Sequence, residues 1–477
     1  MKISIRYFIF LISLFISLTG QSVEVTKTDR QKLSLTIYNK DLALIRDQRQ
    51  ISLKRGNNIL NFVDISPNIR PESATLVSIP SQSQKFKVIE QSYEANLLHT
   101  QNLLLHYLGK KIGVIGSQSS ETEKREAVLL GISDNHEEVI LSFEDGHIET
   151  GIFPNQLIYP RIPKTLKSYP TLTVSINAKE TEKQLTALSY LTHHLNWNAN
   201  YIAQLNQEGD QLTLISRANI TNQSGMSYLD AQVQLMAGDI HHLPASTQYE
   251  KPQMRILALA KTDSISPREE PLSDYHLYTL PQIITLKNNQ TKQIPLFDTQ
   301  KVSGHVSYEI HSDSPRFYDF QSTTAQKLPV TSYFNFKNSK KLGLGIPLPA
   351  GAMQFYQPDT EGHLQFIGED QINHTSENSL VTLNLGHAFD ITATKKQRID
   401  SKVEDYIFET TEIVLHNQKI KPVTVKVVEF IPDLDSREIL SENYSHQQEI
   451  ANRISWHIPV PKQDEVSLIV KMKINKK

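Results

Sequence analysis

The sequence predicts an all-β fold made of antiparallel β-sandwich domains, a small barrel of SH3 or OB size and one short helix. Short alternating or β-branched runs recur roughly every 8–15 residues through most of the chain. Only one segment has helical periodicity, and no repeat of fixed period is present. Many short strands without long intervening helices are typical of sandwiches and barrels, and not of a parallel α/β sheet. At roughly 150 residues per domain, 477 residues suggest about three domains.

The N-terminus predicts an export signal. Lys2 and Arg6 precede the apolar run Tyr7–Leu18, and small or polar residues follow it. This order is typical of a secretory signal peptide, and the run is too short to span a hydrocarbon core of about 30 Å as a helix. We expect cleavage after Gly20 or Ser22. An uncleaved N-terminal anchor is the alternative, because cleavage after Gly20 would leave a leucine where a small residue is preferred.

Composition narrows the possible functions. The 49 Lys and Arg nearly balance the 51 Asp and Glu, so the chain lacks the basic excess typical of nucleic-acid binding. Because there is no Cys, disulfide frameworks, thiolate zinc sites, Cys nucleophiles and lipidation of an N-terminal Cys are excluded. No stretch after the signal is apolar and long enough to span a membrane. An exported chain without Cys fits a bacterial envelope better than a eukaryotic secretory route, so we expect a periplasmic or secreted protein.

The clearest predicted strand is Trp197–Leu205. Its alternate residues share one face, and we interpret this stripe with Trp197 and Tyr201 as core packing. The other predicted strands are Leu33–Tyr38, Leu42–Arg46, Gln50–Leu53, Asn58–Val63, Ala74–Ile79, Leu212–Ile220, Ala231–Ala237, Ile283–Leu286, Val381–Leu385, Glu412–His416, Val423–Phe430, Ile454–Val460 and Val466–Ile474.

The segment Glu94–Gly109 is the one predicted helix. Its leucines recur at helical spacing, and Gly109 is a typical C-terminal stop. Lys110–Pro163 follows with about five short runs joined by tight turns such as Glu144–His147, which predicts the small barrel. Small barrels often bind peptides or polysaccharides, but a fold by itself does not assign a function.

Proline-rich and polar stretches mark the expected domain boundaries. Several prolines punctuate the chain around Pro160, and Lys261–Ser273 is a polar stretch that we expect to form a surface loop. The predicted organisation is a signal peptide (1–22), an N-terminal β region (23–93), the helix (94–109), the small barrel (110–163), a β-sandwich region (164–260), the surface loop (261–273) and a C-terminal β-sandwich (274–477).

Local signatures of common catalytic sites are missing from the sequence. There is no Walker-type loop, no GxGxxG after a strand, no GxSxG elbow and no HExxH. The nearest approach to a zinc motif, His136-Glu137-Glu138, lies in a predicted turn and lacks a second His at i+4. We interpret it as a solvated turn.

Two sets of residues are the remaining candidates for chemistry. Imidazole and carboxylate ligands for zinc or copper could come from His193-His194, His241-His242, Asp230 and Asp239. A carboxylate pair of glycosidase type could come from Glu369 with Asp370, or from His387 with Asp390. Adjacent residues on a strand point to opposite faces, so each His pair offers one ligand per face, and we favour surface or turn roles. The sequence therefore predicts no catalytic residue, no metal ligand and no cofactor, and leaves the ligand-binding site unknown.

Glycine, proline and turn-forming residues in several segments predict bends or turns of the backbone. Leu342–Gly351 places glycines and prolines where a strand must bend or leave a sheet, which we interpret as a sandwich corner, with a ligand-lining loop as the alternative. Ala237–Asp239 and Asn222–Gly225 are predicted turns.

Motifs along most of the chain resemble those of a known group. They are Ile37–Asp47, Leu188–Leu191 with Trp197–Tyr201, Ala218-Asn219 with Asn222 and Ser224-Gly225, Leu235–Asp239, Tyr275–Leu286, Leu348–Gly351, Tyr356, Gly362, Phe366–Asp370 with Ile372, and Leu385-Gly386 with Phe389-Asp390. In this order they resemble exported bacterial proteins of the mucoidy-inhibitor-like family, which carry a C-terminal domain of unknown function 4139. The chain is similar to a compact Gram-negative version that carries the small barrel in place of a long coiled-coil insertion. The resemblance implies a secreted or periplasmic β-sandwich protein and implies no catalytic residues.

The leading hypothesis is a non-enzymatic envelope or secreted protein that binds a protein or polysaccharide component of the envelope. One alternative is a carbohydrate-active or metal-dependent hydrolase, and another is a structural module of an envelope assembly. An enzyme should gather acids or histidines from distant strands into a concave pocket, whereas a binding protein should present a flat or grooved surface.

Overall fold

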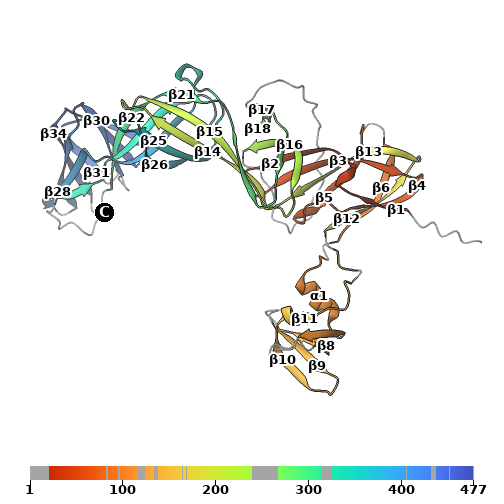
Figure 1. Cartoon of the computed structure of the whole chain (residues 1–477). Coiled ribbons are helices and arrows are strands. Elements are labelled where there is room, and N and C mark those ends of the chain that lie inside the picture. The colour runs from red at the N-terminus through yellow and green to blue at the C-terminus, as the bar shows by residue number, and fades with distance from the viewer. Residues whose placement is uncertain are drawn as a thin grey trace, which may run out of the picture. The chain divides into compact units, whose positions relative to one another are not determined.

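The computed structural model describes residues 21–81, 84–94, 97–115, 124–133, 138–163, 165–167, 169–238, 267–313, 325–403, 405–430, 437–450 and 452–475. Within these ranges the fold is all-β, as predicted, and one α-helix and three short 3-10 helices accompany the strands (Figure 1). No described helix combines the length and the apolar character needed to cross a membrane. The chain divides into two compact units, residues 1–196, 221–234 and 282–290 in one and residues 197–220, 235–281 and 291–477 in the other. Each unit therefore combines three separated stretches, whereas the sequence suggested domains that follow one another.

The first unit contains two sheets and a small module with a sheet of its own. One has the strand order β1 (Gln21–Val25), β4 (Gly56–Phe62), β12 (Thr171–Ala178), β6 (Phe86–Glu94). The other includes the order β16 (Tyr228–Ala237), β2 (Arg30–Tyr38), β3 (Ala43–Leu53), β13 (Glu182–Thr192), β5 (Ile69–Ser78), and β19 (Ile284–Leu286) also pairs with β16. The 3-10 helix η1 (Lys27–Asp29) joins β1 to β2. Of the expected signal peptide, residues 1–20 lie outside the described residues, and Gln21 and Ser22 open β1.

One strand replaces two that the sequence predicted here. Leu42–Arg46 and Gln50–Leu53 were expected to be separate, but β3 is continuous and pairs with β13 from Ala43 to Leu53. The prediction was wrong because the charged middle of this strand is buried. Asp47 and Arg49 alternate with solvent-side residues like any inward-facing pair, so the strand keeps its period of two.

The small module is inserted between two strands that pair with each other, β6 and β12. It contains α1 (Thr100–Tyr107), β7 (Lys111–Ile115), β8 (Lys124–Ile132), β9 (Val139–Phe143), β10 (Ile148–Ile152), η2 (Pro154–Gln156) and β11 (Leu157–Ile158). Its five strands have the order β10-β9-β8-β7-β11. Leu104 and Tyr107 from the helix and Leu129 and Leu141 from the strands share a separate hydrophobic core. This module, residues 97–163, is called the inserted module below.

The helix is shorter than the predicted range of 94–109. Strand β6 continues to Glu94, and Leu97 forms a β-bridge with Lys167, so the helix begins only at Thr100. His99 caps it by accepting a hydrogen bond from the Asn102 backbone N–H at 3.4 Å. The early leucines that extended the predicted periodicity therefore belong to the connection into the module.

The second unit begins with one large sheet and a hairpin. The sheet has the order β20 (Gln290–Pro295), β15 (Gln211–Asn222), β14 (Leu195–Leu205), β25 (Gly351–Pro358), β26 (Leu364–Ile372), and β21 (Gln300–Ser303) pairs with β15. The hairpin pairs β17 (Arg268–Leu272) with β18 (Tyr275–Thr279). Part of the expected surface loop at 261–273 is therefore a strand, because Arg268–Leu272 finds a ladder partner. The rest of that loop, up to residue 266, lies outside the described residues.

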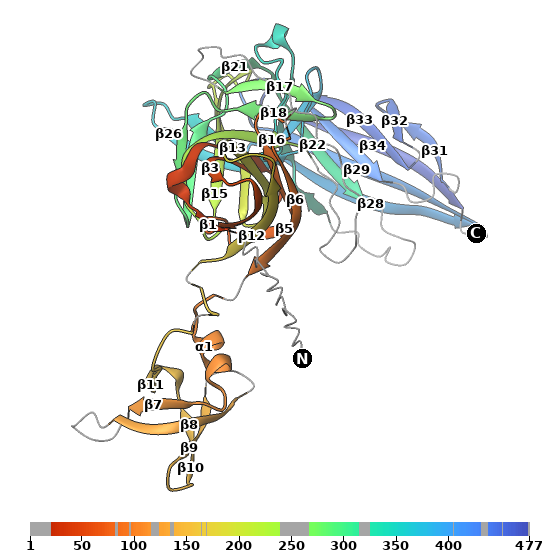
Figure 2. The same cartoon turned by 90° about the vertical axis from the view of Figure 1, so that its right-hand side faces the viewer.

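Two further sheets of the second unit form a C-terminal sandwich. One has the order β27 (Leu380–His387), β24 (Thr331–Lys337), β22 (His305–Asp313), β30 (Val423–Phe430), β33 (Arg453–Val460), β32 (His446–Ile450). The other has the order β23 (Gln326–Leu328), β28 (Ile391–Val403), β29 (Tyr406–Asn417), β34 (Asp464–Asn475), β31 (Arg437–Glu442), and Figure 2 shows the last four side by side. Both sheets contribute to one core that includes Val427, Trp456, Ile413 and Leu468. The pairs β1–β4, β14–β25 and β22–β30 are parallel, a departure from purely antiparallel sheets.

The glycine- and proline-rich segment Leu342–Gly351 leads across to β25, as expected of a sandwich corner. A Cβ at Gly351 would lie 2.1 Å from the Ala199 carbonyl oxygen, so only glycine allows β25 to pair closely with β14. The hydroxyl of Tyr201 donates to the Pro349 carbonyl at 2.8 Å, and the hydroxyl of Tyr278 donates to the Pro347 carbonyl at 3.1 Å. These bonds hold the segment against the core.

Buried asparagines fix three of the turns. The side-chain amides of Asn222, Asn338 and Asn417 each donate to backbone carbonyls, and their side-chain oxygens accept backbone N–H groups. At Asn222–Gly225, for example, the Asn222 oxygen accepts from the Ser224 N–H at 3.1 Å and from its hydroxyl at 2.8 Å. A buried amide that satisfies four or five backbone groups is a structural device, so these residues act in folding.

Candidate functional site

The aromatic stripe of β14 is core, as predicted. Trp197 and Tyr201 are fully buried, and the Trp197 indole N–H donates to the Met236 carbonyl at 3.0 Å. Burial raises the pKa of Tyr201 well above its ordinary value, so the phenol stays neutral. Neither ring is available to stack on a sugar or a peptide.

The paired histidines His193 and His194 lie in the turn after β13, against the β2–β3 turn. The Asp41 carboxylate accepts from the His194 backbone N–H at 2.6 Å, and His193 Nδ1 lies 3.0 Å from the Asp41 carbonyl oxygen. Both imidazoles are at least one-third exposed. The contacts tie two turns together, and no cluster of three His, Cys, Asp or Glu that could hold a metal occurs among the described residues.

Of the other proposed metal ligands, the structure describes only Asp230. Asp230 is exposed on β16, has a positive φ of 49°, and donates its backbone N–H to the Thr285 hydroxyl at 3.2 Å. Asp239 and His241-His242 lie outside the described residues, as do His136 and Glu137 of the predicted solvated turn.

The proposed carboxylate pairs have separate local roles. Glu369 is exposed on β26, whereas the Asp370 carboxylate accepts the Asn384 backbone N–H at 2.8 Å and so connects β26 to β27. His387 is exposed at the end of β27, and Asp390 lies 3.8 Å from Lys419. Asp370 and Asp390 are therefore described by these contacts with neighbouring elements.

The most strongly connected ionic groups are buried inside the first unit. Asp47 accepts two hydrogen bonds from Arg30, at 2.9 and 2.8 Å, and two from Arg49, at 3.0 and 2.7 Å. Arg49 also donates to the Val25 carbonyl at 2.9 Å and to the Asp64 carbonyl at 3.1 Å, and its guanidinium lies 5.7 Å from the centre of the Phe62 ring. This N-terminal ion cluster (Arg30, Asp47, Arg49) joins β3 to the opposite sheet and leaves no room for a ligand.

A second ionic cluster is buried in the C-terminal sandwich. Lys395 on β28 donates to the Ser312 hydroxyl at 2.7 Å and to Glu429 at 3.3 Å across the two sheets. Nearby, burial raises the pKa of Glu409, and the positive charges of Arg437 and Lys395 oppose that rise. Among the described residues, Glu409 Oε2 and Arg437 Nη1 have no hydrogen-bond partner. We call Lys395, Glu409, Glu429 and Arg437 the C-terminal ion cluster.

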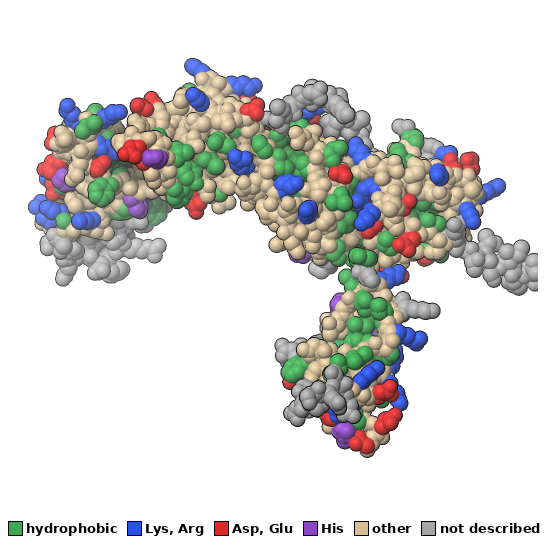
Figure 3. All heavy atoms as spheres, viewed as in Figure 1, with side chains coloured by type: hydrophobic (Ala, Val, Ile, Leu, Met, Phe, Trp, Pro, Cys, Tyr) green, Lys and Arg blue, Asp and Glu red, His purple; other side chains and the backbone are tan. Residues whose placement is uncertain are grey.

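Among the described residues of the inserted module, seven large apolar side chains are exposed. Leu105 and Leu108 on the helix side, Ile140 and Ile148 on adjacent strands, and Phe153 in the turn after β10 are among its exposed large side chains; Leu130 and Ile162 complete the set. Phe153 is 49% exposed and Ile148 60% exposed. Figure 3 shows hydrophobic side chains at the surface of this module. Exposed apolar groups gathered on one small domain are typical of a docking surface.

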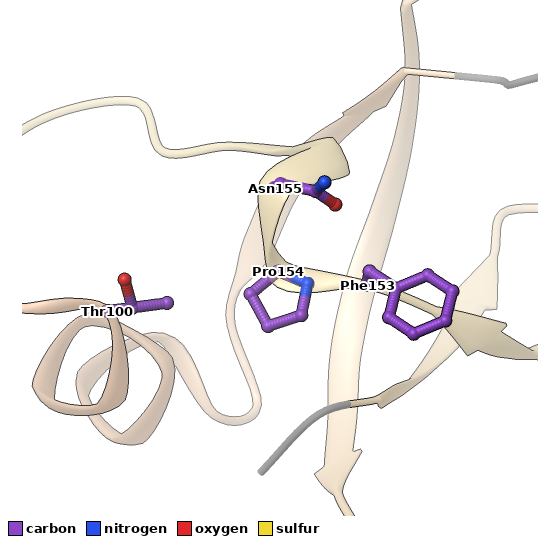
Figure 4. A pocket seen from close by; sticks show the side chains of 4 residues that line it. All are labelled: Thr100, Phe153, Pro154 and Asn155. Carbon is purple, nitrogen blue, oxygen red and sulfur yellow. The ribbon is translucent and has the colours of Figure 1, made fainter.

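A shallow pocket of about 440 Å³ lies in the same module. Thr100 from the first turn of α1 and Phe153, Pro154 and Asn155 from the turn into η2 line it (Figure 4). Apolar carbon from the phenyl and proline rings forms its wall, and the threonine hydroxyl and the asparagine amide supply hydrogen-bonding groups. A wall of this composition accepts an apolar side chain and offers polar anchors beside it.

A second hollow of about 460 Å³ in the module has an acidic rim. Glu126, Glu144 and Asp145 line it together with Arg125, Phe143 and His147. The Arg125 guanidinium lies 4.5 Å from the centre of the Phe143 ring, and it binds Glu149 in bidentate fashion at 2.6 and 2.9 Å. Hydrogen bonds that the His147 imidazolium donates to Glu149 and Asp145 raise the pKa of His147, so its positive charge persists to higher pH. Arg125 and His147 are already paired, and Glu144 has an exposed ion pair with Lys111 at 3.4 Å, so the rim keeps an acidic character mainly through Glu126.

Sequence reasoning anticipated the module but not these residues. Leu105 was taken as part of the apolar face of the helix, although only Leu104 and Tyr107 are buried there. A prediction that started the helix at Thr100 would have placed Leu105 on its solvent-exposed face. The prolines around Pro160 were taken as a domain junction and Phe153 was not singled out, although a large aromatic residue in a junction is itself a signal of contact with something else.

Comparison with known proteins gives one result. Residues 186–476 match the family described as Domain of unknown function (DUF4139). The match begins within β13, after the inserted module, and extends through the C-terminal sandwich. No protein among the curated ones matches the chain. Because the matched residues make up more than half of the sequence, the chain belongs to the DUF4139 family.

Proposed function

We propose that the protein is an exported, non-enzymatic component of the cell envelope that binds a protein partner through the inserted module. The observation that carries the proposal is the apolar surface around Phe153, which the module's own core does not need. The module is inserted between two strands that pair with each other, so it is presented on the rest of the unit without taking part in its sheets. A partner segment with apolar and basic side chains fits the pocket and the acidic rim.

The export part of the proposal rests on the charged and apolar N-terminal run and on the absence of Cys. The resemblance to mucoidy-inhibitor-like proteins supports a periplasmic or secreted location in a Gram-negative bacterium. Within that group the chain would be a compact version with the inserted module in place of a coiled coil. We propose cleavage after Gly20, since cleavage after Ser22 would remove two residues of β1 and the 2.9 Å bond from Asn61 to the Ser22 hydroxyl. N-terminal sequencing of the mature protein separates the two sites.

The binding role is tested by affinity capture from mildly cross-linked envelopes. The full mature protein is compared with Phe153→Ser and with the control Phe366→Ser, which removes a phenyl ring of similar exposure from β26. We expect one partner protein that is captured by the wild type and the control and is reduced at least fivefold by Phe153→Ser, because a central aromatic anchor is typically worth more than about 1 kcal/mol.

Three results would contradict this role. A partner lost with Phe366→Ser and retained with Phe153→Ser would place the interface on β26. Capture of no protein by any variant, together with hydrolysis of a glycan that requires Glu369 or Asp370, would favour the hydrolase alternative. A stable homo-oligomer that is insensitive to Phe153→Ser would favour a structural module of an assembly.

A further inference from the structure

The outer face of the sheet that contains β28, β29 and β34 carries a row of basic residues. On these strands alternate residues are buried in the sandwich, so Lys396 and Arg398, Thr410 and Glu412, and Ile469 and Lys471 face away from the core. The same residues, with Gln397, line a groove of about 390 Å³. That volume lies within the range of small-molecule and oligosaccharide sites.

The strand register arranges these side chains in two rows. Arg398 pairs with Thr410, and Thr410 pairs with Lys471, so one row reads cation, hydroxyl, cation across three strands. Lys396 pairs with Glu412, and Glu412 pairs with Ile469, so the neighbouring row reads cation, carboxylate, apolar. Because neighbouring strands are about 4.8 Å apart, the two cations of the first row lie about 10 Å apart.

The cations of the groove are incompletely neutralised. Arg398 has an ion pair with Asp400 at 2.8 Å, and the Asp400 carboxylate also accepts from the Thr410 hydroxyl. Within the part of the chain that the structure describes, Lys396 and Lys471 form no hydrogen bond or ion pair. Glu412 faces Lys396 across the strands without a salt bridge. The positive charge of Lys471 also contributes to lowering the pKa of Asp400, but without an ion pair, so the ammonium groups of Lys396 and Lys471 keep donors for an anionic ligand.

We propose that this groove binds an acidic polysaccharide, with Lys396 and Lys471 holding carboxylates of the sugar chain. The mixture of cationic, carboxylate and apolar side chains in the groove, and not its positive charge alone, favours an acidic sugar. A polyphosphate or a nucleic acid presents mainly acceptors, so the Glu412 carboxylate in the floor would repel it. An acidic sugar presents both carboxylates and hydroxyl donors, and the hydroxyls can donate to Glu412 while the carboxylates bind the lysines. The face of Ile469 gives the sugar ring an apolar contact. The site is separate from the inserted module and does not depend on its role.

The test is direct binding of the full mature protein to polygalacturonate, measured by titration calorimetry. The test variant is Lys396→Gln/Lys471→Gln, and the matched control is Lys421→Gln/Lys462→Gln, which removes the same charge from exposed lysines outside the groove. We expect the test variant to bind about tenfold more weakly and the control to bind within about twofold of the wild type. Binding should also weaken as salt shortens the Debye length from about 30 Å at 0.01 M to about 8 Å at 0.15 M.

Two further arms separate other sources of anion. Neutral dextran should not bind, and vesicles containing phosphatidylglycerol should bind no more tightly to the wild type than to the test variant. Equal loss of polygalacturonate binding in the test and control variants would overturn the proposal, since it would show a general charge effect. Vesicle binding that requires Lys396 and Lys471 while polygalacturonate does not bind would overturn it in favour of a membrane surface.

Discussion

The two buried ion clusters of this protein satisfy their charges to different degrees. In the N-terminal ion cluster, Asp47 is bound by both arginines, and Arg49 uses its remaining donors on two backbone carbonyls. In the C-terminal ion cluster, Lys395 reaches Glu429, but Glu409 and Arg437 each keep a buried atom without a partner among the described residues. A fully bonded buried network makes a sandwich rigid, whereas a partly bonded one costs stability. The comparison therefore predicts that breaking a bonded pair destabilises either cluster, whereas neutralising the incompletely bonded Glu409 stabilises the C-terminal sandwich.

The largest effect is expected for Asp47→Ala. This change leaves Arg30 and Arg49 as uncompensated buried charges, and it should destabilise the first unit by about 5 kcal/mol. The measurement is hydrogen exchange of the amides of β3 and β13. If Asp47→Ala does not fold, Arg30→Met is the companion variant: it retains the Asp47–Arg49 pair and should destabilise the first unit clearly less. Equal losses for the two variants would contradict a cluster organised around Asp47.

Lys395→Met should have the next largest effect. It removes the only described cross-sheet ion pair of Glu429 and the bond to Ser312, so we expect a loss of about 3 kcal/mol. Trp456 is buried in the same sandwich, and its fluorescence reports urea unfolding there. A midpoint unchanged from the wild type would show that the pair contributes no net stability.

Glu409→Gln should have a small effect at low pH and stabilise the sandwich at neutral pH. The pKa of Glu409 is raised in the folded state, so the folded protein binds the proton more tightly than the unfolded chain. Stability of the wild type therefore falls as the pH rises from the ordinary glutamate pKa through the raised pKa of Glu409. The glutamine variant lacks this loss, and the gain should be about 1 kcal/mol above the raised pKa. A variant with the same pH dependence as the wild type would contradict a raised pKa.

The smallest effect is expected for Lys473→Gln, the surface counterpart of these changes. Lys473 lies 3.4 Å from Glu438 and 4.4 Å from the centre of the Tyr406 ring, and both partners are partly exposed. Surface pairs of this kind contribute about 0.5 kcal/mol or less. A loss as large as that of Lys395→Met would show that burial is not what separates the clusters from surface pairs.

The same two clusters explain two of the strands that the sequence did not predict correctly. Alternation predicted β14 because its inward residues are apolar, Trp197 and Tyr201 among them. It divided β3 at Asp47 and Arg49, and it missed β28, whose inward face includes Lys395. The pattern of one sequence indicates that a charged residue faces solvent. The oppositely charged partner that allows its burial lies on another strand, so the sequence pattern does not show it. The pairing of distant strands within each unit could also not be predicted from the sequence, because parallel partners such as β14 and β25 are far apart in the chain.

The functional surfaces were only partly predictable. The small barrel was expected from its short runs and turns, and its insertion between paired strands was not. The candidate acids and histidines were named from their chemistry, and the structure assigns those it describes to turns, strand contacts and exposed positions. The exposed Phe153 and the groove with Lys396 and Lys471 were not predictable, because strand register and helix length decide which residues face solvent.

The most direct test of the binding role is site-specific photo-cross-linking from position 153. A photoreactive phenylalanine analogue at Phe153, in the full exported protein, is compared with the same analogue at Phe366 on β26. Our account predicts one discrete adduct with an envelope protein from position 153 and none of that mass from position 366. No adduct from position 153, or the same adduct from both positions, would contradict a binding surface on the inserted module.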